Sequence, residues 1–384
     1  MKRYCNLKVG HSFAGVLLLS GMVQAHAQTA DVLSVSAGLG VLSSSNIAQS
    51  AVASPLSDQI TTGTAGLHIN KPAGLQRFLV DATFIGNQYA SNTNYNYTAQ
   101  NYSAVMQWSI SPDVFGELSS VRTDTLNAGA NSVDPTKRNL NTLKTSALTA
   151  NYGLNGAFRI TGGFASTTST NEAALVGQSN DQNDGFNLGI AYTLASKNSV
   201  QFMSSAVHGN NGLPYDSALQ QLSFAIVSSP KTTINGSLGY QTVNFSSSSQ
   251  YNFSGTVGAL AVNWAATDRF AINTGWQRVL NAYQTSGSSY TQTDTLSILP
   301  TWRMSEKISF GYTAKYGQRS EMGSPNGTLS GRQDRIQDNG LSFVWRPSRK
   351  MTVTVSFDDL ETISNTVNQS YSVQQAGIAA AYTF

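Results

Sequence analysis

The stretch Ile308–Tyr316, with the sequence ISFGYTAKY, alternates strictly between apolar or aromatic side chains and small or polar ones. Successive side chains of a β-strand point to opposite faces of the sheet, so this stretch predicts a strand with one apolar and one polar face. Residues 186–193 and 351–358 repeat the alternation. A soluble sandwich would show the same period, so the pattern predicts strands without deciding where they lie.

The composition narrows the class of protein. Only 11% of the 384 residues are charged, whereas roughly 25% is usual in a soluble domain. Hydrophobic residues make up 40%, so Ser, Thr, Asn, Gln and Gly replace the missing charge. This balance argues against a soluble cytosolic enzyme, a nucleic-acid binder and a helical membrane protein. The plentiful aromatics and the small net charge argue against disorder.

The N-terminal segment has the features of a secretory signal. Basic residues precede an apolar stretch from about Phe13 to Val23, and Ala25-His26-Ala27 supplies a small-x-small cleavage pattern. The apolar run is shorter than the ~20 residues that a membrane-spanning helix needs. We therefore expect residues 1–27 to be a signal peptide and residues 28–384 to form one domain. Cleavage would remove the only cysteine and leave equal numbers of basic and acidic residues.

Three features favour a transmembrane barrel over a sandwich. The polar face of the alternating segments is rich in Gly, Ser, Thr and Asn rather than Lys and Glu. Tight turns recur about every forty residues, and longer polar segments separate them, which is the asymmetry of outer-membrane barrels. The turns are expected near Pro72, Pro112, Asn155, Lys197, Pro230, Thr267, Ser305 and Pro347. The longer loops are expected at Ser91–Asn96, Asn127–Lys137, Thr168–Asn183, Ser246–Gln250 and Met322–Gly331.

This arrangement predicts an all-β, antiparallel up-and-down barrel of about 18 strands, with 16 as the alternative, in the outer membrane of a Gram-negative bacterium. Its short turns and both chain ends would lie on the periplasmic side. Eight of the nine prolines fall in predicted turns or loops. The exception, Pro300, interrupts an alternating run and indicates either a bulge or a wrong register.

Aromatic residues mark one predicted end of the strands. Six of them lie shortly before short turns and on the apolar face of their strand: Trp108, Tyr152, Tyr192, Trp264, Trp302 and Trp345. Because amphipathic rings prefer the membrane–water boundary, these six are interpreted as the inner aromatic girdle in contact with outer-membrane lipid. Trp276 would belong to the outer girdle. The alternative is that they are core residues of a sandwich.

The last strand, residues 376–384, alternates and ends on Phe384. A terminal aromatic of this kind resembles the signal that outer-membrane barrels present to the barrel assembly machinery, which is therefore an expected partner.

No pattern predicts catalysis. The mature chain keeps two histidines, His68 and His208, and neither has a second histidine or a nearby carboxylate at ligand spacing in the sequence. Neither G-x-S-x-G nor H-E-x-x-H is present. We expect no enzyme, no catalytic residue, no metal, no cofactor and no nucleic-acid partner.

The charged residues expected on the lumen face give a hypothesis for function. Strand parity predicts these pore-lining positions: Arg77, Asp81, Glu117, Arg159, Arg269, Arg303, Lys315, Arg346 and Asp358. The five arginines lie near short turns and would form a basic collar inside the periplasmic mouth. Such a ring enriches the opposite charge, so the collar would admit an anionic or polar polymer from the periplasm. Alternatively, the arginines pair with turn acids such as Asp113, Asp268 and Glu306, or anchor the rim.

The segment Gln76–Thr83, with the Tyr-rich stretch that follows it (Tyr89, Tyr95, Tyr97 and Tyr102), resembles the EpsL-type barrel proteins of exopolysaccharide biosynthesis loci. The resemblance runs through most of the mature chain. It implies export of a polysaccharide across the outer membrane, with possible periplasmic export partners, and it carries no functional residues.

Two other functions stay open. A general or substrate-selective diffusion porin would have a similar strand count and a polar lumen, although no predicted loop is long enough to fold inward and narrow the channel. A non-conducting structural barrel or adhesin is third, because 18 strands enclose a lumen too wide for side chains to fill.

Overall fold

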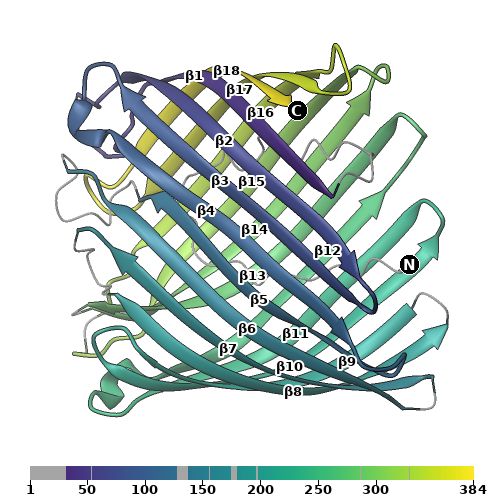
Figure 1. Cartoon of the computed structure of the whole chain (residues 1–384). Helices are drawn as coiled ribbons and strands as arrows, with labels where there is room; N and C mark the ends of the chain where they lie inside the picture. Colours follow the sequence, from purple (N-terminus) through teal and green to yellow (C-terminus); the bar gives the residue numbers. More distant parts are fainter. Residues whose placement is uncertain are drawn as a thin grey trace.

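The computed structural model describes residues 32–52, 54–127, 137–154, 156–173, 180–195, 198–285, 287–327 and 329–384. These residues form one 18-stranded antiparallel sheet that closes into a barrel (Figure 1). The expected signal peptide, residues 1–27, lies outside the described residues. Among the described residues, no helix is long and apolar enough to cross a membrane.

The strands run up and down the barrel in sequence order. Their bounds are β1 Leu33–Ser44, β2 Asp58–Ala73, β3 Gln76–Tyr89, β4 Tyr97–Ser109, β5 Val114–Leu126, β6 Leu140–Leu154, β7 Phe158–Asn171, β8 Asp181–Ala195, β9 Asn198–Asn210, β10 Pro214–Ser229, β11 Thr232–Phe245, β12 Phe253–Trp264, β13 Phe270–Thr285, β14 Ser288–Arg303, β15 Ile308–Met322, β16 Gln333–Trp345, β17 Met351–Ser364 and β18 Tyr371–Thr383. Two short 3-10 turns, η1 (Thr93–Tyr95) and η2 (Ser249–Tyr251), lie in the β3–β4 and β11–β12 loops.

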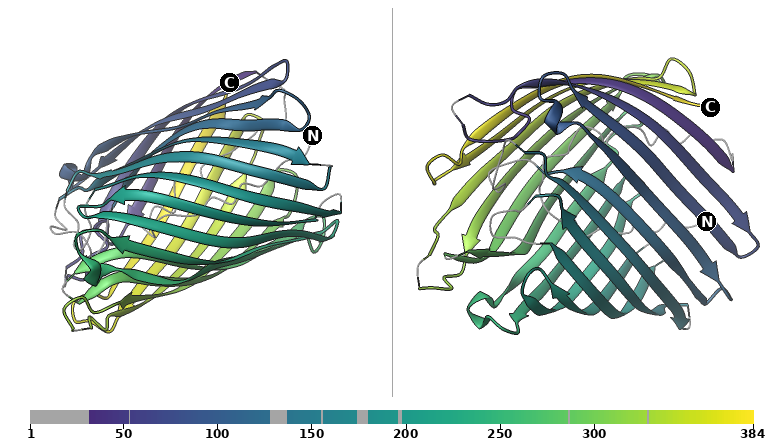
Figure 2. Two further views of the ribbon diagram at one scale, coloured as in Figure 1. Left: turned by 90° about the horizontal axis from the view of Figure 1, so that it is seen from below. Right: turned by 60° about the vertical axis from the view of Figure 1, so that its left-hand side comes forward.

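The barrel closes where the two ends of the chain meet. Strand β1 pairs with β18 from Ser36, opposite Thr383, to Ser44, opposite Gln375. The views in Figure 2 show a single layer of tilted strands that curves around the barrel axis. The prediction of an all-β, up-and-down barrel with 18 strands is confirmed, and the alternative of 16 strands is wrong.

The predicted turns agree with the observed connections. Six of them lie at, or within two residues of, a connection between strands at the same end of the barrel, and the other two, Asn155 and Lys197, lie outside the described residues. The predicted loop Thr168–Asn183 is too long, because β7 continues to Asn171 and β8 begins at Asp181. The strand residues in this range are mostly hydroxyl and amide side chains, so no apolar alternation marked them as strand.

Pro300 causes a different irregularity from the predicted bulge. It pairs with Ile272 of β13, while the ladder between β14 and β15 lacks pairs at Leu299 and Pro300. The register on both sides of this gap is the same, since Ile298 pairs with Ala314 and Thr301 with Gly311. A residue without an N–H group therefore interrupts the ladder without shifting it.

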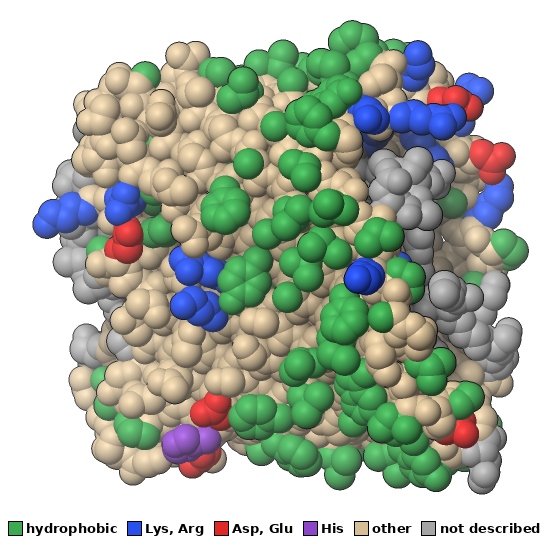
Figure 3. Space-filling view, in the orientation of Figure 1, with side chains coloured by type: hydrophobic (Ala, Val, Ile, Leu, Met, Phe, Trp, Pro, Cys, Tyr) green, Lys and Arg blue, Asp and Glu red, His purple; other side chains and the backbone are tan. Residues whose placement is uncertain are grey.

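Apolar side chains cover the outside of the barrel. Many large hydrophobic residues are exposed at alternating strand positions, including Leu39 (70%) and Leu238 (64%). In Figure 3 these apolar side chains form a broad diagonal band across the visible wall. A soluble monomer does not present so large a contiguous apolar surface. The exterior is suited to lipid, and the inward face carries the polar half of each strand.

The first loop of the barrel folds against its inner wall. Residues 46–50, in the loop between β1 and β2, are almost wholly buried. Ile47 and Ala48 pack with Ile60 and Tyr89, whose side chains face inward by register. The sequence predicts no loop long enough to fold inward and narrow the channel, but this loop does pack on the inner wall, because its short apolar Ile-Ala pair contacts Ile60 and Tyr89 there.

Two loops at the same end share one local structure. In the sequences YASNTNYNY (89–97) and FSSSSQYNF (245–253), the side-chain oxygen of an asparagine accepts a hydrogen bond from a backbone N–H seven residues earlier. Asn96 accepts from Tyr89 and Asn252 from Phe245, both at 2.7 Å. Each loop thereby seats its aromatic residues in one of the two buried clusters of the molecule's described part.

The wall is tightest where Trp108 meets Gly116. These residues are paired between β4 and β5, and a Cβ on Gly116 would collide with the Trp108 ring and with the carbonyl of Thr149. We expect Gly116→Ala to destabilise the barrel by about 1–3 kcal/mol, the usual cost of overpacking. Resistance to urea of the refolded barrel in detergent measures this. Gly86→Ala is the matched control, since a Cβ there meets nothing within 4 Å. Equal stability of the two variants would contradict the packing argument.

Candidate functional site

Strand register decides which side chains face the lumen. On β9 to β12 the inward positions carry only uncharged side chains, as in Gln201, Ser217 and Gln241. On β15 to β17 the inward positions carry charge, in particular Lys315, Asp338 and Asp358. The lumen of the described barrel thus has an uncharged polar wall and, elsewhere on its circumference, a charged one.

The structure puts the predicted pore-lining residues at two kinds of position. Seven lie at inward positions of strands: Arg77, Asp81, Glu117, Arg159, Arg303, Lys315 and Asp358. Arg269 lies in the turn between β12 and β13, and Arg346 lies just after β16. The five arginines are spread around the circumference at the short-turn end, although Arg269 and Arg303 are neighbours, since the Arg303 backbone N–H donates to the Arg269 carbonyl at 2.7 Å.

The arginines of this collar, Arg77, Arg159, Arg269, Arg303 and Arg346, have mostly neutral surroundings. The Arg77 Nε donates to Asn70 Oδ1 at 2.8 Å. One guanidinium N–H of Arg303 donates to the backbone carbonyl of Asp268 at 3.0 Å, not to its carboxylate. Among the described residues, no carboxylate lies within ion-pair distance of Arg77, Arg269, Arg303 or Arg346. The expected alternative, pairing with Asp113, Asp268 or Glu306, is therefore not observed for these four.

The middle of the charged wall is built from three neighbouring strands. Lys315 of β15 pairs in register with Asp338 of β16, and its Nζ lies 3.2 Å from Asp338 Oδ2. Asp358 of β17 lies opposite Gly340, and its carboxylate occupies the space that a side chain there would fill. Lys315 is thus a single cation in a cluster with two carboxylates, those of Asp338 and Asp358.

A second charged cluster lies nearer to the long-loop end of the barrel, at the end of β15 and the beginning of β16. Arg319 and Arg332 both bind Asp334, through the Arg319 Nε at 2.9 Å and the Arg332 Nε at 3.0 Å. Arg332 also lies 3.6 Å from Glu321. Sequence analysis missed these four residues. Arg319 and Glu321 share the parity of Lys315, so extending the alternation beyond Tyr316 would have found them, whereas their partners depend on register.

Both histidines have carboxylate neighbours, contrary to expectation. His68 Nδ1 lies 2.6 Å from Asp81 Oδ1 across the β2–β3 pair, and His208 Nδ1 lies 2.8 Å from Asp216 Oδ1 across β9–β10. Antiparallel pairing joins residues that sequence spacing separates, which is why the pattern search failed. The His68 pair faces the lumen and the His208 pair faces outward. Within the described ranges, no group of three potential ligands could hold a metal.

The six aromatic residues expected to form the inner girdle lie at outward positions near the ends of their strands. Four of them, Tyr152, Trp264, Trp302 and Trp345, are close to half exposed. Ring contacts continue around this end, for example between Trp302 and Phe310 at 5.9 Å. Trp276 is also outward, farther from the short turns.

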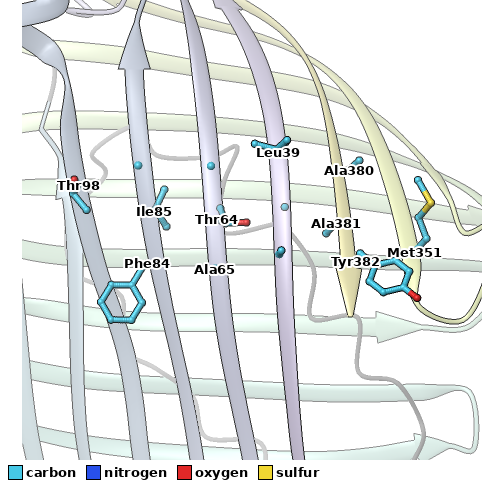
Figure 4. A pocket seen from close by; sticks show the side chains of 14 residues that line it. Leu39, Thr64, Ala65, Phe84, Ile85, Thr98, Met351, Ala380, Ala381 and Tyr382 are labelled. Carbon is cyan, nitrogen blue, oxygen red and sulfur yellow. The ribbon is translucent and has the colours of Figure 1, made fainter. Parts of the chain in front are cut away.

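An apolar depression of about 640 Å³ lies on the wall around the closure seam (Figure 4). Small residues such as Ala65 and Ala380 form its floor, and Phe84, Leu39 and Tyr382 border it. These side chains occupy the outward positions of their strands. The depression therefore faces lipid and is no candidate for binding a polar solute in the lumen.

Comparison with known proteins gives matches of fold only. No family model matches the chain, and no curated protein matches its sequence. Among solved structures, it is similar to OccAB4 of Acinetobacter baumannii (9% identity, TM-score 0.54, 93% of this chain and 100% of that one). It is also similar to OpdQ of Pseudomonas aeruginosa (11%, 0.53, 92% and 97%) and to the outer membrane protein opdK of the same species (10%, 0.52, 92% and 99%).

These neighbours correct the family resemblance. They are substrate-specific porins rather than polysaccharide export proteins, so the EpsL-type identification is wrong. The Tyr-rich stretch that suggested it has a local structural explanation, since Tyr89 and Tyr95 belong to the packed loop cluster. The neighbours are channels and not enzymes. Together with the apolar exterior, the fold places the chain in the bacterial outer membrane.

The buried carboxylate of Asp334 gives a test of the charged wall. Its side chain is 1% exposed and lies between two arginines. Removing one partner of a buried ion pair leaves the others uncompensated, so we expect Asp334→Ala to cost about 3–5 kcal/mol of stability. Urea unfolding in lipid vesicles measures it. Asp81→Ala is the control, because the Asp81 side chain is 56% exposed and its loss should cost under about 1 kcal/mol. Equal losses of stability in Asp334→Ala and Asp81→Ala would contradict the interpretation of Asp334 as the buried partner of two arginines.

Proposed function

We propose that this protein is a water-filled diffusion channel that favours small anionic solutes. The observation that carries the proposal is the collar of arginines at the short-turn mouth, four of which have no carboxylate within ion-pair distance in the described part of the chain. An array of like charges in a low-dielectric wall attracts and concentrates the opposite charge. The exposed side chains of Arg269, Arg303 and Arg346 leave this charge accessible to solutes.

The dimensions of the barrel support conduction. Barrels of 16–18 strands leave an aqueous channel, whereas eight strands are filled by side chains. The inward-facing Asp81 keeps more than half of its side chain exposed, which requires water inside the wall. The solved structures of similar fold are channels rather than enzymes, which agrees with an open, non-catalytic lumen in this protein.

The charged part of the lumen wall carries a series of cationic side chains from one mouth of the barrel toward the other. From the short-turn end, a solute meets Arg303, then Lys315, then Arg319, all at inward positions of β14 and β15. The carboxylates beside Lys315 and Arg319 limit their net attraction. We infer that these groups guide anions weakly, so that a bound solute leaves as readily as it enters.

The outside of the barrel sets its orientation in the membrane. We infer that the short turns face the periplasm and that the six aromatics at this end mark the inner lipid boundary. Phe384 is exposed, while its backbone N–H donates to the carbonyl of Val35 at 2.8 Å. This end of β18 remains our candidate for recognition by the barrel assembly machinery.

Ion selectivity tests the collar. In planar bilayers with a KCl gradient, the reversal potential of the wild-type channel should indicate preference for chloride. In the triple variant Arg77→Glu, Arg303→Glu, Arg346→Glu, the potassium-to-chloride permeability ratio calculated from the reversal potential should rise several-fold, because three like charges change sign. Lys71→Glu is the control, since Lys71 lies at the same end but faces outward. A cation-selective wild type, or an equal shift in the control, would contradict the proposal; absence of any conductance would favour a structural barrel.

The inward-folded first loop tests the size of the channel. Replacing residues 46–50 with a glycine-serine segment of equal length removes the apolar contacts that hold the loop to Ile60 and Tyr89. We expect a larger and noisier single-channel current, because the loop would then leave the wall and move within the mouth. Replacing the exposed residues 366–368 of the β17–β18 loop is the control. An unchanged current in the first variant would show that this loop does not limit conduction.

A further inference from the structure

Apart from Lys71 at the short-turn end, the outward-facing charges of the described strands lie toward the long-loop end of the barrel wall. From Tyr152 to Lys144, from Tyr192 to Asp184 and from Trp302 to Asp294, outward positions stay uncharged until the eighth residue. With a rise of about 3.3 Å per residue and a tilt near 45°, this is roughly 19 Å along the barrel axis. The apolar band of such barrels is about 25 Å tall. These positions therefore lie within about 6 Å of the outer edge of that band, where a long basic side chain can extend its charged end to headgroup level.

Most of these boundary charges have partners on the protein. Arg278 Nε lies 2.8 Å from Asp294 Oδ1 on the neighbouring strand. His208 pairs with Asp216, and the Arg335 guanidinium lies over the ring of Tyr316, 5.9 Å from its centroid. Such pairing offsets the cost of holding charge at the edge of an apolar layer.

Lys144 is different. Its side chain is exposed and outward, and no acid or aromatic ring of the described chain pairs with it. It is directly opposite Arg122 in the β5–β6 register, so two cations lie side by side. The Arg122 guanidinium binds Asp124 through Nε at 3.1 Å and through one terminal nitrogen at 3.0 Å.

Asp124 neutralises Arg122 but leaves the charge of Lys144 uncompensated. Its side chain is 1% exposed, and it also accepts hydrogen bonds from the Gln100 backbone N–H and the Thr142 hydroxyl, both at 2.8 Å. The carboxylate is therefore buried in the wall, whereas Lys144 is exposed and 26% of the Arg122 side chain remains exposed.

Hydroxyl groups surround the two cations. Ser120 and Ser146 are paired with each other on the outward face, two residues from Arg122 and Lys144 along their strands. Thr168 is paired with Lys144 from the other side. In Figure 3 this wall, beyond the apolar band, is mostly uncharged polar surface with basic side chains at its edge. Cations flanked by hydroxyls match the oxygen atoms of a phosphate and of a sugar.

We propose that Arg122, Lys144 and the neighbouring hydroxyls of Ser120, Ser146 and Thr168 bind the phosphorylated headgroup of a glycolipid in the outer leaflet. The lipid phosphate supplies the counter-charge that Lys144 lacks, and its acyl chains lie along the apolar wall below. The next strands carry Asp184 and Asp216 at the same level, so anionic headgroups are directed to β5–β7 rather than spread around the barrel.

The test is native mass spectrometry of the full-length purified barrel with a bis-phosphorylated, acylated diglucosamine lipid, the same lipid without phosphates, and inorganic phosphate. Wild type should retain the phosphorylated lipid at least about fivefold better than the dephosphorylated one, since one basic side chain near an anionic surface contributes about 1 kcal/mol. Lys144→Glu should abolish this preference. Arg335→Gln, at another outward boundary position, should preserve it.

Several results would overturn the proposal. Equal retention of the two lipids would mean that only acyl chains are bound. Retention unaffected by Lys144→Glu, or lost equally in Arg335→Gln, would place binding elsewhere. Comparable binding of inorganic phosphate would make this a site for a soluble anion. Because Lys144 faces away from the lumen, Lys144→Glu should keep wild-type conductance, so this test is independent of channel selectivity.

Discussion

The pairing of β1 with β18 is the constraint on which the rest of the molecule depends. In the hydrocarbon of a bilayer, an unpaired backbone N–H or C=O has no water to bind, so a sheet can remain there only if it has no edge. The register from Ser36 to Ser44 against Gln375 to Thr383 removes that edge. It also ties the last residue to the first strand, through Phe384 and Val35. Closure therefore fixes an inside and an outside for all the other strands.

Once the sheet is closed, the two-residue period of each strand separates two environments. Outward positions form an apolar surface between aromatic rings at one end and charges at the other. Inward positions keep polar groups in water. The two buried hydrophobic clusters lie at the long-loop mouth, where residues 46–50 and the two asparagine-anchored loops cover parts of the wall. The described part of the barrel therefore has no central hydrophobic core, and its stability depends on the ladder and on contacts within the wall.

The charges of the two faces have different roles in our interpretation. Inside, arginines without carboxylate partners at one mouth and paired charges on β15–β17 give the lumen a graded attraction for anions. Outside, charges on the strands lie mainly toward the long-loop end, and some are neutralised by partners on adjacent strands, as Arg278 is by Asp294. Arg122 and Lys144 lie next to strands that carry Asp184 and Asp216 at the same level. Transport and lipid binding would thus use the two faces of one wall without sharing a residue.

The sequence by itself determined the strand count, six of the eight short turns and the inward face of seven of the nine predicted pore-lining residues, because alternation and turn residues are local properties. It failed where partners are distant. The His68–Asp81 and Lys315–Asp338 contacts, the inward packing of Ile47 and the position of Pro300 in the ladder depend on which residues lie opposite one another. The resemblance based on Gln76–Thr83 and the following tyrosines also misled, since packed loops and amphipathic strands recur in barrels of different function. Only the tertiary structure decided these points, because register joins residues that the chain separates.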